Sequence, residues 1–189
     1  MHKESRTDEE LYRDYFTHGN SDALQCLVER YSDSLTFFLK GIVKTHEDAE
    51  DLMIETFAQL LSRDKHFQGK SSFKTWLFAI GRNQALKFLR SNHRAKIDEV
   101  TPSPILSPEE FIVHQEQSEQ ILTALSKLPD DYRDALFLIY VEELRYEQAA
   151  KIMHKNTKQI TNLVYRGKQM LQKLLPPDYP LFSKRNTPL

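Results

Sequence analysis

The fold of the C-terminal half is decided by the stretch Leu144-Arg-Tyr-Glu-Gln-Ala-Ala-Lys-Ile-Met-His-Lys-Asn-Thr-Lys-Gln-Ile-Thr-Asn-Leu-Val-Tyr-Arg-Gly-Lys-Gln-Met-Leu171. In its first half, apolar or small side chains recur every three or four residues at Tyr146, Ala149, Ala150 and Met153. This spacing places them on one face of a helix. The second half repeats the pattern, with an inner face made of Ile160, Leu163, Val164, Gly167, Met170, Leu171 and Leu174. The stretch therefore predicts two helices joined by a tight turn, a helix-turn-helix.

The turn between the two helices has its own signals. Asn156 is a favourable N-cap for the second helix, and Gln159 stands three residues later, where its side chain can complete a capping box. His154 stands where the turn requires a positive φ. Glycine is the usual residue at such a position, and His is among the residues that tolerate it.

The outer face of the second helix is polar and basic. No acidic residue occurs from residue 148 to 177, while six Lys and Arg residues do. Such a distribution suits contacts with DNA phosphates, and a helix of this kind fits the major groove. A solvated basic helix in an ordinary bundle is the alternative that the pattern leaves open. The residues expected to face DNA are Lys158, Gln159, Thr161, Asn162, Tyr165 and Arg166.

Composition predicts an all-helical protein. The chain has 189 residues, only 5 of them Gly, and it is rich in Leu, Glu, Lys, Gln and Arg, without a regular alternation of strands and turns. The formal net charge is −1, but the charge is unevenly spread, so local fields decide the contacts. Cys26 is the only cysteine, which excludes an internal disulfide. No apolar run is long enough to span a membrane, so we expect a cytoplasmic protein.

The N-terminal half predicts a helix over residues 8–18, a longer one from about residue 21, and a third capped by Thr45. One face of the third helix carries a polar stripe, because its members recur every three or four residues. A stripe of this kind is usually only solvated, and the alternative is a surface for a partner. Its members are Asp48, Asp51, Glu55 and Gln59.

A polar loop and a basic helix follow. Gly69 is expected at the bend of the loop and Ser71 or Ser72 at the start of the helix. Basic side chains interleaved with aromatic ones suit single-stranded DNA, because rings stack on unpaired bases while Lys and Arg follow the phosphates. Phe73 and Trp76 have core spacing, so the exposed ring is expected at Phe67. The candidate residues are Phe67, Gln68, Gly69, Lys70, Ser71, Lys74, Arg82, Lys87 and Arg90.

The chain divides into two small helical domains. Three prolines between residues 101 and 108 forbid a continuous helix and indicate a flexible linker. We therefore expect a first domain over residues 1–93, a linker over 94–115 and a second domain over 116–175 that ends in the helix-turn-helix. A helix is expected from Pro108 to Leu128, and the tail over 176–189 is expected to be disordered.

The sequence gives no support for an enzyme. No nucleophile-base pair, phosphate-binding glycine loop or complete metal set occurs. His46-Glu47-x-x-Glu50 and the pair Glu110 and His114 are incomplete as zinc motifs, since no second histidine follows His46 at the helical repeat and no cysteine supports either one. No cofactor and no metal are expected.

Two segments carry a resemblance to one family. Residues 45–94 contain Asp48-Ala-Glu-Asp-Leu-x-x-Glu-x-Phe57, Phe67-x-Gly69, Ser72-Phe-x-Thr-Trp-Leu77 and Gly81-Arg-Asn83. These motifs resemble region two of bacterial sigma factors of the extracytoplasmic-function (ECF) type. Leu128-Pro129, Tyr146-Glu147 and Gln159-Ile-Thr-Asn-Leu-Val-Tyr-Arg166 resemble region four of the same family. Two motifs in the right order are more specific than either alone.

The resemblance implies a non-catalytic subunit that binds core RNA polymerase and directs it to promoter DNA. By position, the acidic stripe would dock on a coiled coil of the largest polymerase subunit, with the polymerase flap as a further contact. The loop and basic helix would help to melt the minus-ten element, and the loop would shape a pocket for a flipped base. The helix-turn-helix would read the minus-thirty-five element, with Lys and Arg as phosphate clamps and Gln or Asn as base readers.

Many members of this family are held inactive by an anti-sigma factor, which the resemblance adds as a partner. The chain also departs from the family at His154, where Gly is usual, at Arg145, where Ser or Thr is usual, and at Thr161-Asn162, where Ser-Arg is frequent. The promoter sequence therefore cannot be carried over. A stand-alone helix-turn-helix regulator, which would bind duplex DNA as a dimer without polymerase, is the alternative function.

Overall fold

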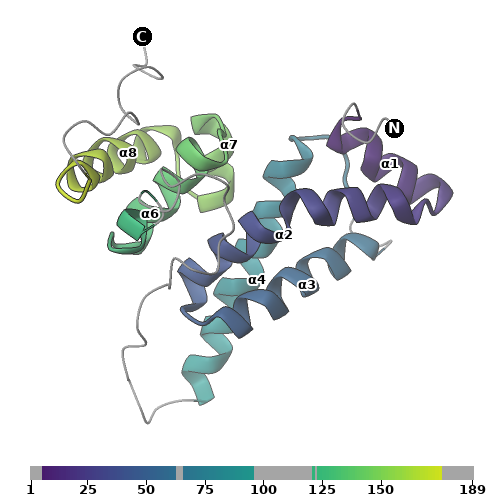
Figure 1. The fold of residues 1–189 in the computed structure, drawn as a ribbon, viewed down its shortest axis with the longest axis horizontal. Helices are drawn as coiled ribbons and strands as arrows, with labels where there is room; N and C mark the ends of the chain where they lie inside the picture. Colours follow the sequence, from purple (N-terminus) through teal and green to yellow (C-terminus); the bar gives the residue numbers. More distant parts are fainter. Residues whose placement is uncertain (1–5, 63–65, 96–120, 122, 176–189) are drawn as a thin grey trace.

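The structure is a computed structural model, and it describes residues 6–62, 66–95, 121 and 123–175. All the regular structure in these ranges is helical, which confirms the predicted all-α class. The helices form two groups that lie against each other, α1 to α4 and α6 to α8 (Figure 1). Residues 96–120, which include most of the linker expected over 94–115 and most of the helix expected from Pro108, lie outside the described residues, as does the tail over 176–189. None of the described helices is long and apolar enough to cross a membrane.

The first group consists of α1 (Asp8–His18), α2 (Ser21–Val43), α3 (His46–Leu61) and α4 (Phe73–Ala95). Its helix ends follow the sequence signals. Gly19 closes α1 at φ 68°, and the Thr45 side chain accepts a hydrogen bond from the backbone N–H of Asp48 at the start of α3. The expected third helix and its cap are confirmed, while α4 extends beyond its expected end near Arg90.

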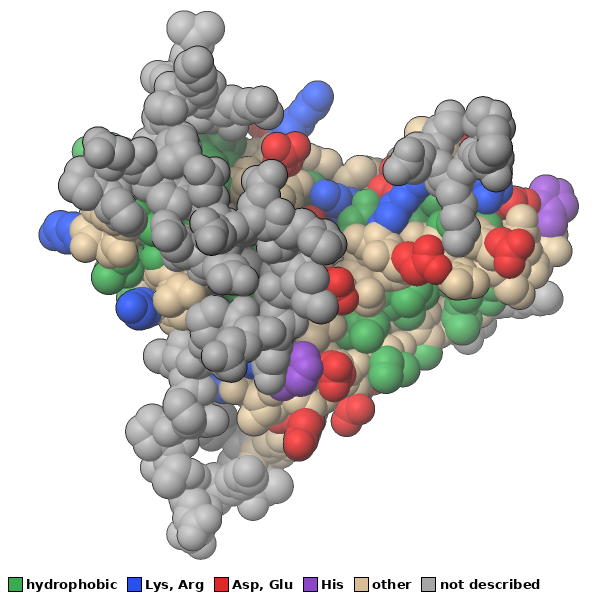
Figure 2. All heavy atoms as spheres, viewed as in Figure 1, with side chains coloured by type: hydrophobic (Ala, Val, Ile, Leu, Met, Phe, Trp, Pro, Cys, Tyr) green, Lys and Arg blue, Asp and Glu red, His purple; other side chains and the backbone are tan. Residues whose placement is uncertain are grey.

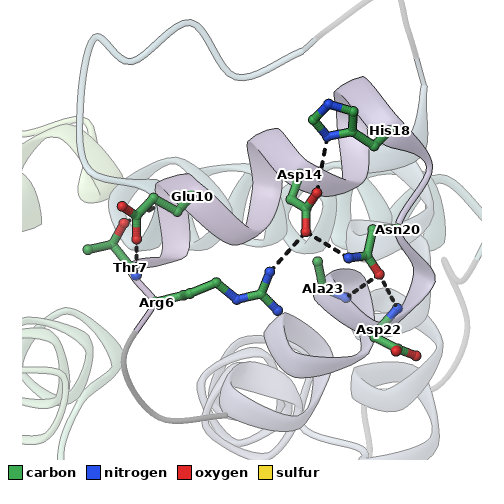
Figure 3. Close-up of polar contacts among 8 residues, drawn as sticks. All are labelled: Arg6, Thr7, Glu10, Asp14, His18, Asn20, Asp22 and Ala23. Atoms are coloured by element: carbon green, nitrogen blue, oxygen red, sulfur yellow. Dashed lines mark hydrogen bonds and ion pairs between the residues drawn. The ribbon is translucent and has the colours of Figure 1, made fainter. Parts of the chain in front are cut away.

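A polar network fixes the corner between α1 and α2 (Figure 3). Asp14 accepts hydrogen bonds from Arg6 at 2.9 Å and from Asn20 Nδ2 at 2.7 Å, and its other oxygen lies 3.1 Å from His18 Nδ1. Asn20 in turn caps α2 by accepting from the backbone N–H groups of Asp22 and Ala23. One carboxylate thus links the segment before α1, the end of α1 and the cap of α2.

The interior of the first group is apolar and aromatic. Phe78 is fully buried between α2 residues, with its ring 6.5 Å from Tyr31 and 5.5 Å from Phe38. Phe73 is fully buried as well, and Trp76 is partly buried against the same core. Both residues were expected in the core, and the structure confirms this.

The second group consists of α6 (Asp130–Leu136), the π-helix η3 (Phe137–Val141), α7 (Tyr146–Met153) and α8 (Thr157–Gln172). A π-helix is a rare wide turn that redirects the chain within one helix. The predicted helix-turn-helix corresponds to α7 and α8. His154 joins them at φ 53°, and the expected capping box is present, since Asn156 Oδ1 accepts from Gln159 N and Gln159 Oε1 accepts from Asn156 N.

Candidate nucleic-acid and partner surfaces

The outer face of α8 is the expected DNA-reading surface. All six residues predicted to face DNA are exposed, and Tyr165 exposes 64% of its surface. The buried row of the helix is Ile160, Val164, Gly167 and Leu171. Met170 and Leu174 were predicted on this inner face but are exposed. Met170 precedes the buried Leu171 by one position, which turns it about 100° away around the helix. Leu174 lies beyond the end of α8 at Gln172.

Close packing against α6 holds α8 in place. A Cβ atom at Gly167 would lie 2.9 Å from Leu136 Cδ1, so only a glycine permits this approach. Beside it, side chains of α6 and α8 line a surface hollow that includes three predicted DNA-facing residues. The hollow is lined by Tyr132, Lys155, Gln159, Asn162, Leu163 and Arg166. Lys155 at its rim pairs with Asp131 at 3.1 Å.

Only part of the acidic stripe on α3 is exposed and without a role in holding the fold. Asp51 and Glu55 are exposed, whereas Asp48 accepts a hydrogen bond from Thr45 Oγ1 at 2.5 Å and Gln59 Oε1 accepts one from Gln84 Nε2 at 2.9 Å. Asp48 and Gln59 therefore also serve the fold. The space-filling view shows acidic side chains with hydrophobic ones beside them along the face of α3 (Figure 2).

Ile54 is an exposed apolar residue on the outer side of α3, with 61% of its surface accessible. Ile54 was not among the residues expected at this surface. The signal was present, because Ile54 follows Asp51 by three residues and precedes Glu55, which places it among the exposed acidic residues. Ile54 adds an apolar contact to a surface that was expected to be purely polar.

The loop before α4 bends where expected, at Gly69 with φ 70°. Gln68, Gly69 and Lys70 are exposed and Ser71 is half-buried. Ser72 caps α4, since its hydroxyl oxygen accepts from the backbone N–H of Thr75 at 3.2 Å. Of the two serines proposed as the cap, the structure selects Ser72.

The prediction that Phe67 is an exposed ring is wrong. Phe67 is half-buried, with its ring centroid 5.4 Å from that of Trp76 and 5.9 Å from that of Tyr12. Its backbone N–H also donates to the Tyr12 hydroxyl oxygen at 3.3 Å. Sequence reasoning could not foresee this, because Tyr12 comes from α1, 55 residues earlier. The exposed aromatic residue near this loop is Phe16, which stacks on His66 at 5.4 Å.

The basic residues of α4 divide into two sets. Lys87 and Arg90 are exposed, whereas Lys74 and Arg82 are partly buried. Lys74 Nζ lies 3.1 Å from Glu142 Oε2 of the second helical group. The positive charge of Arg82 also acts on the second helical group, because it opposes the rise in the pKa of Asp134. Half of the predicted α4 charges therefore face the second group.

Further polar contacts join the two groups. Gln148 Nε2 donates to Ser72 Oγ at 2.9 Å, and His154 Nε2 lies 2.8 Å from Asn83 Oδ1. Lys44 Nζ contacts Asp130 Oδ1 at 2.5 Å. α7 lies beside α4, and α6 lies beside α2, so the first helix of the helix-turn-helix covers part of the basic helix (Figure 1).

A buried ion pair lies behind this contact. Arg133 Nη2 lies 2.6 Å from Asp134 Oδ1, and both side chains are almost completely buried. Burial raises the pKa of Asp134, and the Arg133 guanidinium opposes this rise. Arg133 also lies against α2, because a Cβ atom added to Gly41 would be 2.7 Å from Arg133 Nε. Among the described residues, no group of His, Cys, Asp and Glu side chains could hold a metal ion.

Comparison with known proteins assigns both helical groups. Residues 27–95 match the model of sigma-70 region 2, and residues 118–171 match that of sigma-70 region 4. The ECF RNA polymerase sigma factor SigM of Bacillus subtilis is 31% identical over 152 residues, which cover 78% of this chain and 92% of SigM. The ECF sigma factor BldN of Streptomyces coelicolor is also 31% identical, with 85% of this chain covered and 63% of BldN.

Solved structures show the same fold. The sigma factor RpoE of Bartonella quintana, crystallised with the anti-sigma factor NepR, matches with a TM-score of 0.65 and 27% identity, covering 87% of this chain and 99% of that one. CnrH in complex with the cytosolic domain of CnrY matches with a TM-score of 0.61 and 22% identity, which speaks for the fold alone. The two matched regions, in this order and over most of a relative's length, show that the chain belongs to the ECF sigma factors of the sigma-70 family and is an alternative sigma factor.

Proposed function

We propose that this sigma factor binds core RNA polymerase through α3 and reads promoter DNA through two separate surfaces. One observation carries the proposal. The region 2 part presents an exposed acidic face on α3, and the region 4 part presents an exposed face on α8 that has no acidic residue. These opposite charges suit opposite partners, because the acidic face repels DNA phosphates and the other face attracts them.

The polymerase contact is proposed for the exposed part of the stripe. Asp51 and Glu55 supply the charge and Ile54 an apolar centre, a combination typical of protein interfaces. Asp48 and Gln59 contribute at the edge, since their side chains already hold Thr45 and Gln84. The partner surface is the coiled coil of the largest polymerase subunit, and the flap is proposed as the contact for the second group.

The minus-thirty-five element is proposed to meet α8. Lys158 and Arg166 would clamp phosphates, and Asn162 and Gln159 would read base edges. The Gln159 side-chain oxygen already accepts from Asn156 N, which leaves the amide NH₂ to donate to a base. Thr161 and Tyr165 complete the exposed surface.

The minus-ten element is proposed to lie along the loop 66–72 and α4. Gln68, Gly69, Lys70 and Ser71 form the loop, and Phe67 supports it from the core side by packing on Tyr12 and Trp76. Lys74, Arg82, Lys87 and Arg90 would follow the phosphates of the melted strand. Since the matched RpoE structure is a complex with the anti-sigma factor NepR, an anti-sigma factor is a further proposed partner.

The test is charge reversal on α3. Asp51→Lys combined with Glu55→Lys should weaken the complex with core polymerase by about tenfold or more, because two attractive contacts become repulsive. The matched control is Asp33→Lys combined with Glu147→Lys, which changes the net charge equally at exposed sites on α2 and α7. Affinity is measured by titration of labelled protein with core enzyme, and circular dichroism checks the fold.

Equal affinity in both double variants would overturn the docking surface. Binding of duplex DNA by a dimer, without any affinity for core polymerase, would instead favour a stand-alone regulator. Transcription from promoters selected with the reconstituted holoenzyme tests the function as a whole.

A further inference from the structure

Helix α1 lies against the loop 66–72, the segment proposed above to meet the minus-ten element. No residue of this loop lies in a helix or a strand, so its backbone depends on contacts with other elements. Three side chains of α1 make such contacts, namely Glu9, Tyr12 and Phe16. They follow one another at intervals of three and four residues, which places them on one face of the helix. One face of α1 therefore supports the loop at both of its ends.

The start of the loop is tied to α1 by the Tyr12 hydroxyl. Its oxygen accepts from the backbone N–H of Phe67 at 3.3 Å and donates to the backbone oxygen of Leu60 at 3.5 Å. Leu60 lies in the last turn of α3, so one hydroxyl joins the end of α3 to the start of the loop. Tyr12 is only 3% exposed, and burial raises its pKa, so the hydroxyl keeps the proton that it donates.

The end of the loop is tied to the same helix by Glu9. Glu9 Oε1 accepts from the backbone N–H of Phe73, the first residue of α4, at 2.9 Å. The first N–H groups of a helix have no partner within that helix, and a negative charge close to them is favourable. Glu9 therefore caps α4 from another helix, beside the Ser72 cap, and fixes the point at which the loop passes into α4.

An aromatic stack makes the third contact. The Phe16 ring lies 5.4 Å from the His66 ring and 5.9 Å from the Tyr12 ring, with interplanar angles of 27° and 19°. On the side of the core, the rings of Phe67 and Trp76 lie 5.9 Å and 5.6 Å from that of Tyr12. The stack thus connects the exposed His66, where the loop begins, to the aromatic interior.

Helix α1 is anchored on α2 at both ends, which suits a support. At its start, Arg30 Nη1 lies 2.7 Å from Asp8 Oδ1, and the Tyr31 hydroxyl donates to the other oxygen of the same carboxylate. At its end, the network around Asp14 includes Asn20, the cap of α2 (Figure 3). The loop therefore takes its position from α1, and α1 takes its position from α2.

A site that distinguishes bases needs walls with a fixed shape, because base edges differ only in the placement of donors and acceptors. We propose that α1 holds the loop 66–72 in the shape that selects a base of the minus-ten element, and that Glu9, Tyr12 and Phe16 are positioning residues for promoter specificity that act through the loop. The inference rests on the proposed role of the loop and adds the element that sets its shape.

Two polar contacts can be removed singly with small changes of side chain. Tyr12→Phe removes only the hydroxyl, and its matched control is Tyr15→Phe, which removes a hydroxyl from a partly buried ring of the same helix. Glu9→Ala removes the cap on α4. Glu9→Gln keeps an oxygen that can accept from the backbone N–H of Phe73, so this conservative variant should behave like the wild type.

The first measurement uses the free full-length protein and needs no polymerase. Amide hydrogen exchange, followed by NMR, should be at least about fivefold faster at Phe67 in Tyr12→Phe than in Tyr15→Phe. At Phe73 it should be faster by a similar factor in Glu9→Ala than in Glu9→Gln. Unchanged exchange at both amides would overturn the support of the loop by α1.

The aromatic stack is tested through Trp76, the only tryptophan of the chain. Quenching of its fluorescence by acrylamide should increase about twofold in Phe16→Ala, because the ring cluster around Tyr12 loses its outer member. Thr17→Ala, at an exposed position beside Phe16, is the control and should leave the quenching unchanged. Equal quenching in the two variants would remove Phe16 from the support.

The closing experiment measures specificity with the reconstituted holoenzyme and a promoter library in which only the minus-ten element is randomised. Tyr12→Phe and Glu9→Ala should lower the ratio of transcription between the preferred base and its competitors at a minus-ten position by about threefold or more. Tyr15→Phe and Glu9→Gln should keep the wild-type ratio. A variant that loses only stability would lower all transcripts alike and leave the ratio unchanged.

Faster amide exchange together with unchanged ratios would overturn the role of α1 in specificity. A wild-type holoenzyme without any preference in the minus-ten element would overturn the proposed function of the loop instead. The two failures are distinguishable, because the exchange rates are measured on the free protein.

Discussion

The two helical groups differ most in what they bury. The first group buries Phe73, Phe78 and many aliphatic side chains, and its buried polar residues are Lys40, at its margin with 9% exposed, and the hydroxyls Thr56 and Thr75. The second group is smaller, yet it buries Arg133, Asp134 and Glu142. Apolar burial stabilises at every salt concentration and pH, whereas buried charges are stable only with their partners in place.

This difference teaches how the two groups can separate. An interface of large apolar area would hold them together permanently, because exposure of that area to water costs free energy. The charges near the contact regain hydration when it opens, so the loss is partly offset. The contact between the groups combines the stacked rings of Phe37, Phe38 and Phe137 with the pair of Lys74 and Glu142, so apolar burial and charge both hold it.

The largest effect is expected from a cavity in the first group. Phe78→Ala removes a fully buried ring that contacts Tyr31 and Phe38, and such truncations cost about 3–5 kcal/mol. The free energy of unfolding in urea measures the loss. Ile54→Ala is the control, because an exposed side chain should change stability by less than about 0.5 kcal/mol. A cost at Phe78 as small as the control's would refute the view that the first group depends on its aromatic interior.

A smaller effect on stability is expected when Gly is replaced by Ala at either of two positions, Gly167 and Gly41. Gly167→Ala places a Cβ atom 2.9 Å from Leu136 Cδ1, inside a fully buried contact, so overpacking should cost about 1–3 kcal/mol. At Gly41 the nearest atoms belong to the long side chain of Arg133, which can shift but is buried and paired with Asp134, so the cost should be smaller than at Gly167 without vanishing. Thermal unfolding of the two variants compares them. A larger loss at Gly41 than at Gly167 would mean that the contact between the groups is as rigid as the interior of the second group.

Whether a feature depends on residues that are near or distant in the sequence decides what could be predicted from the sequence. Helix periodicity, the Thr45 and Asn156 caps and the turn at His154 depend on neighbours within a few residues, and the structure confirms them. The exposed face of α8 could be predicted for the same reason. The half-buried state of Phe67 could not, since its partner Tyr12 lies on another helix. The contact of Lys74 with Glu142 joins residues 68 positions apart and leaves no local pattern.

The smallest effect is expected from pH, and here the two groups should respond in opposite directions. Hydrogen bonds from Asn20, and then from His18 and Arg6, lower the pKa of Asp14 in the first group. A group whose pKa is lower in the folded than in the unfolded state stabilises the fold at pH values above its unfolded-state pKa. This stability is lost as the pH falls through the folded-state pKa. Burial raises the pKa of Asp134 in the second group. The contribution of Asp134 to stability is therefore present at pH values below its unfolded-state pKa. It is lost as the pH rises through its folded-state pKa.

Asn substitutions at the two positions separate these responses, because an amide does not titrate. Asp14→Asn should flatten the loss of stability on the acid side of the pKa of an ordinary aspartate, whereas Asp134→Asn should flatten the loss on its alkaline side. Melting temperatures across this range measure both slopes. Because Asp14 lies near the surface, its effect should also shrink with added salt, while that of the buried Asp134 should not. The same salt dependence at both positions would show that Asp134 is hydrated in solution. The view that the second group buries this charge away from water would then be wrong.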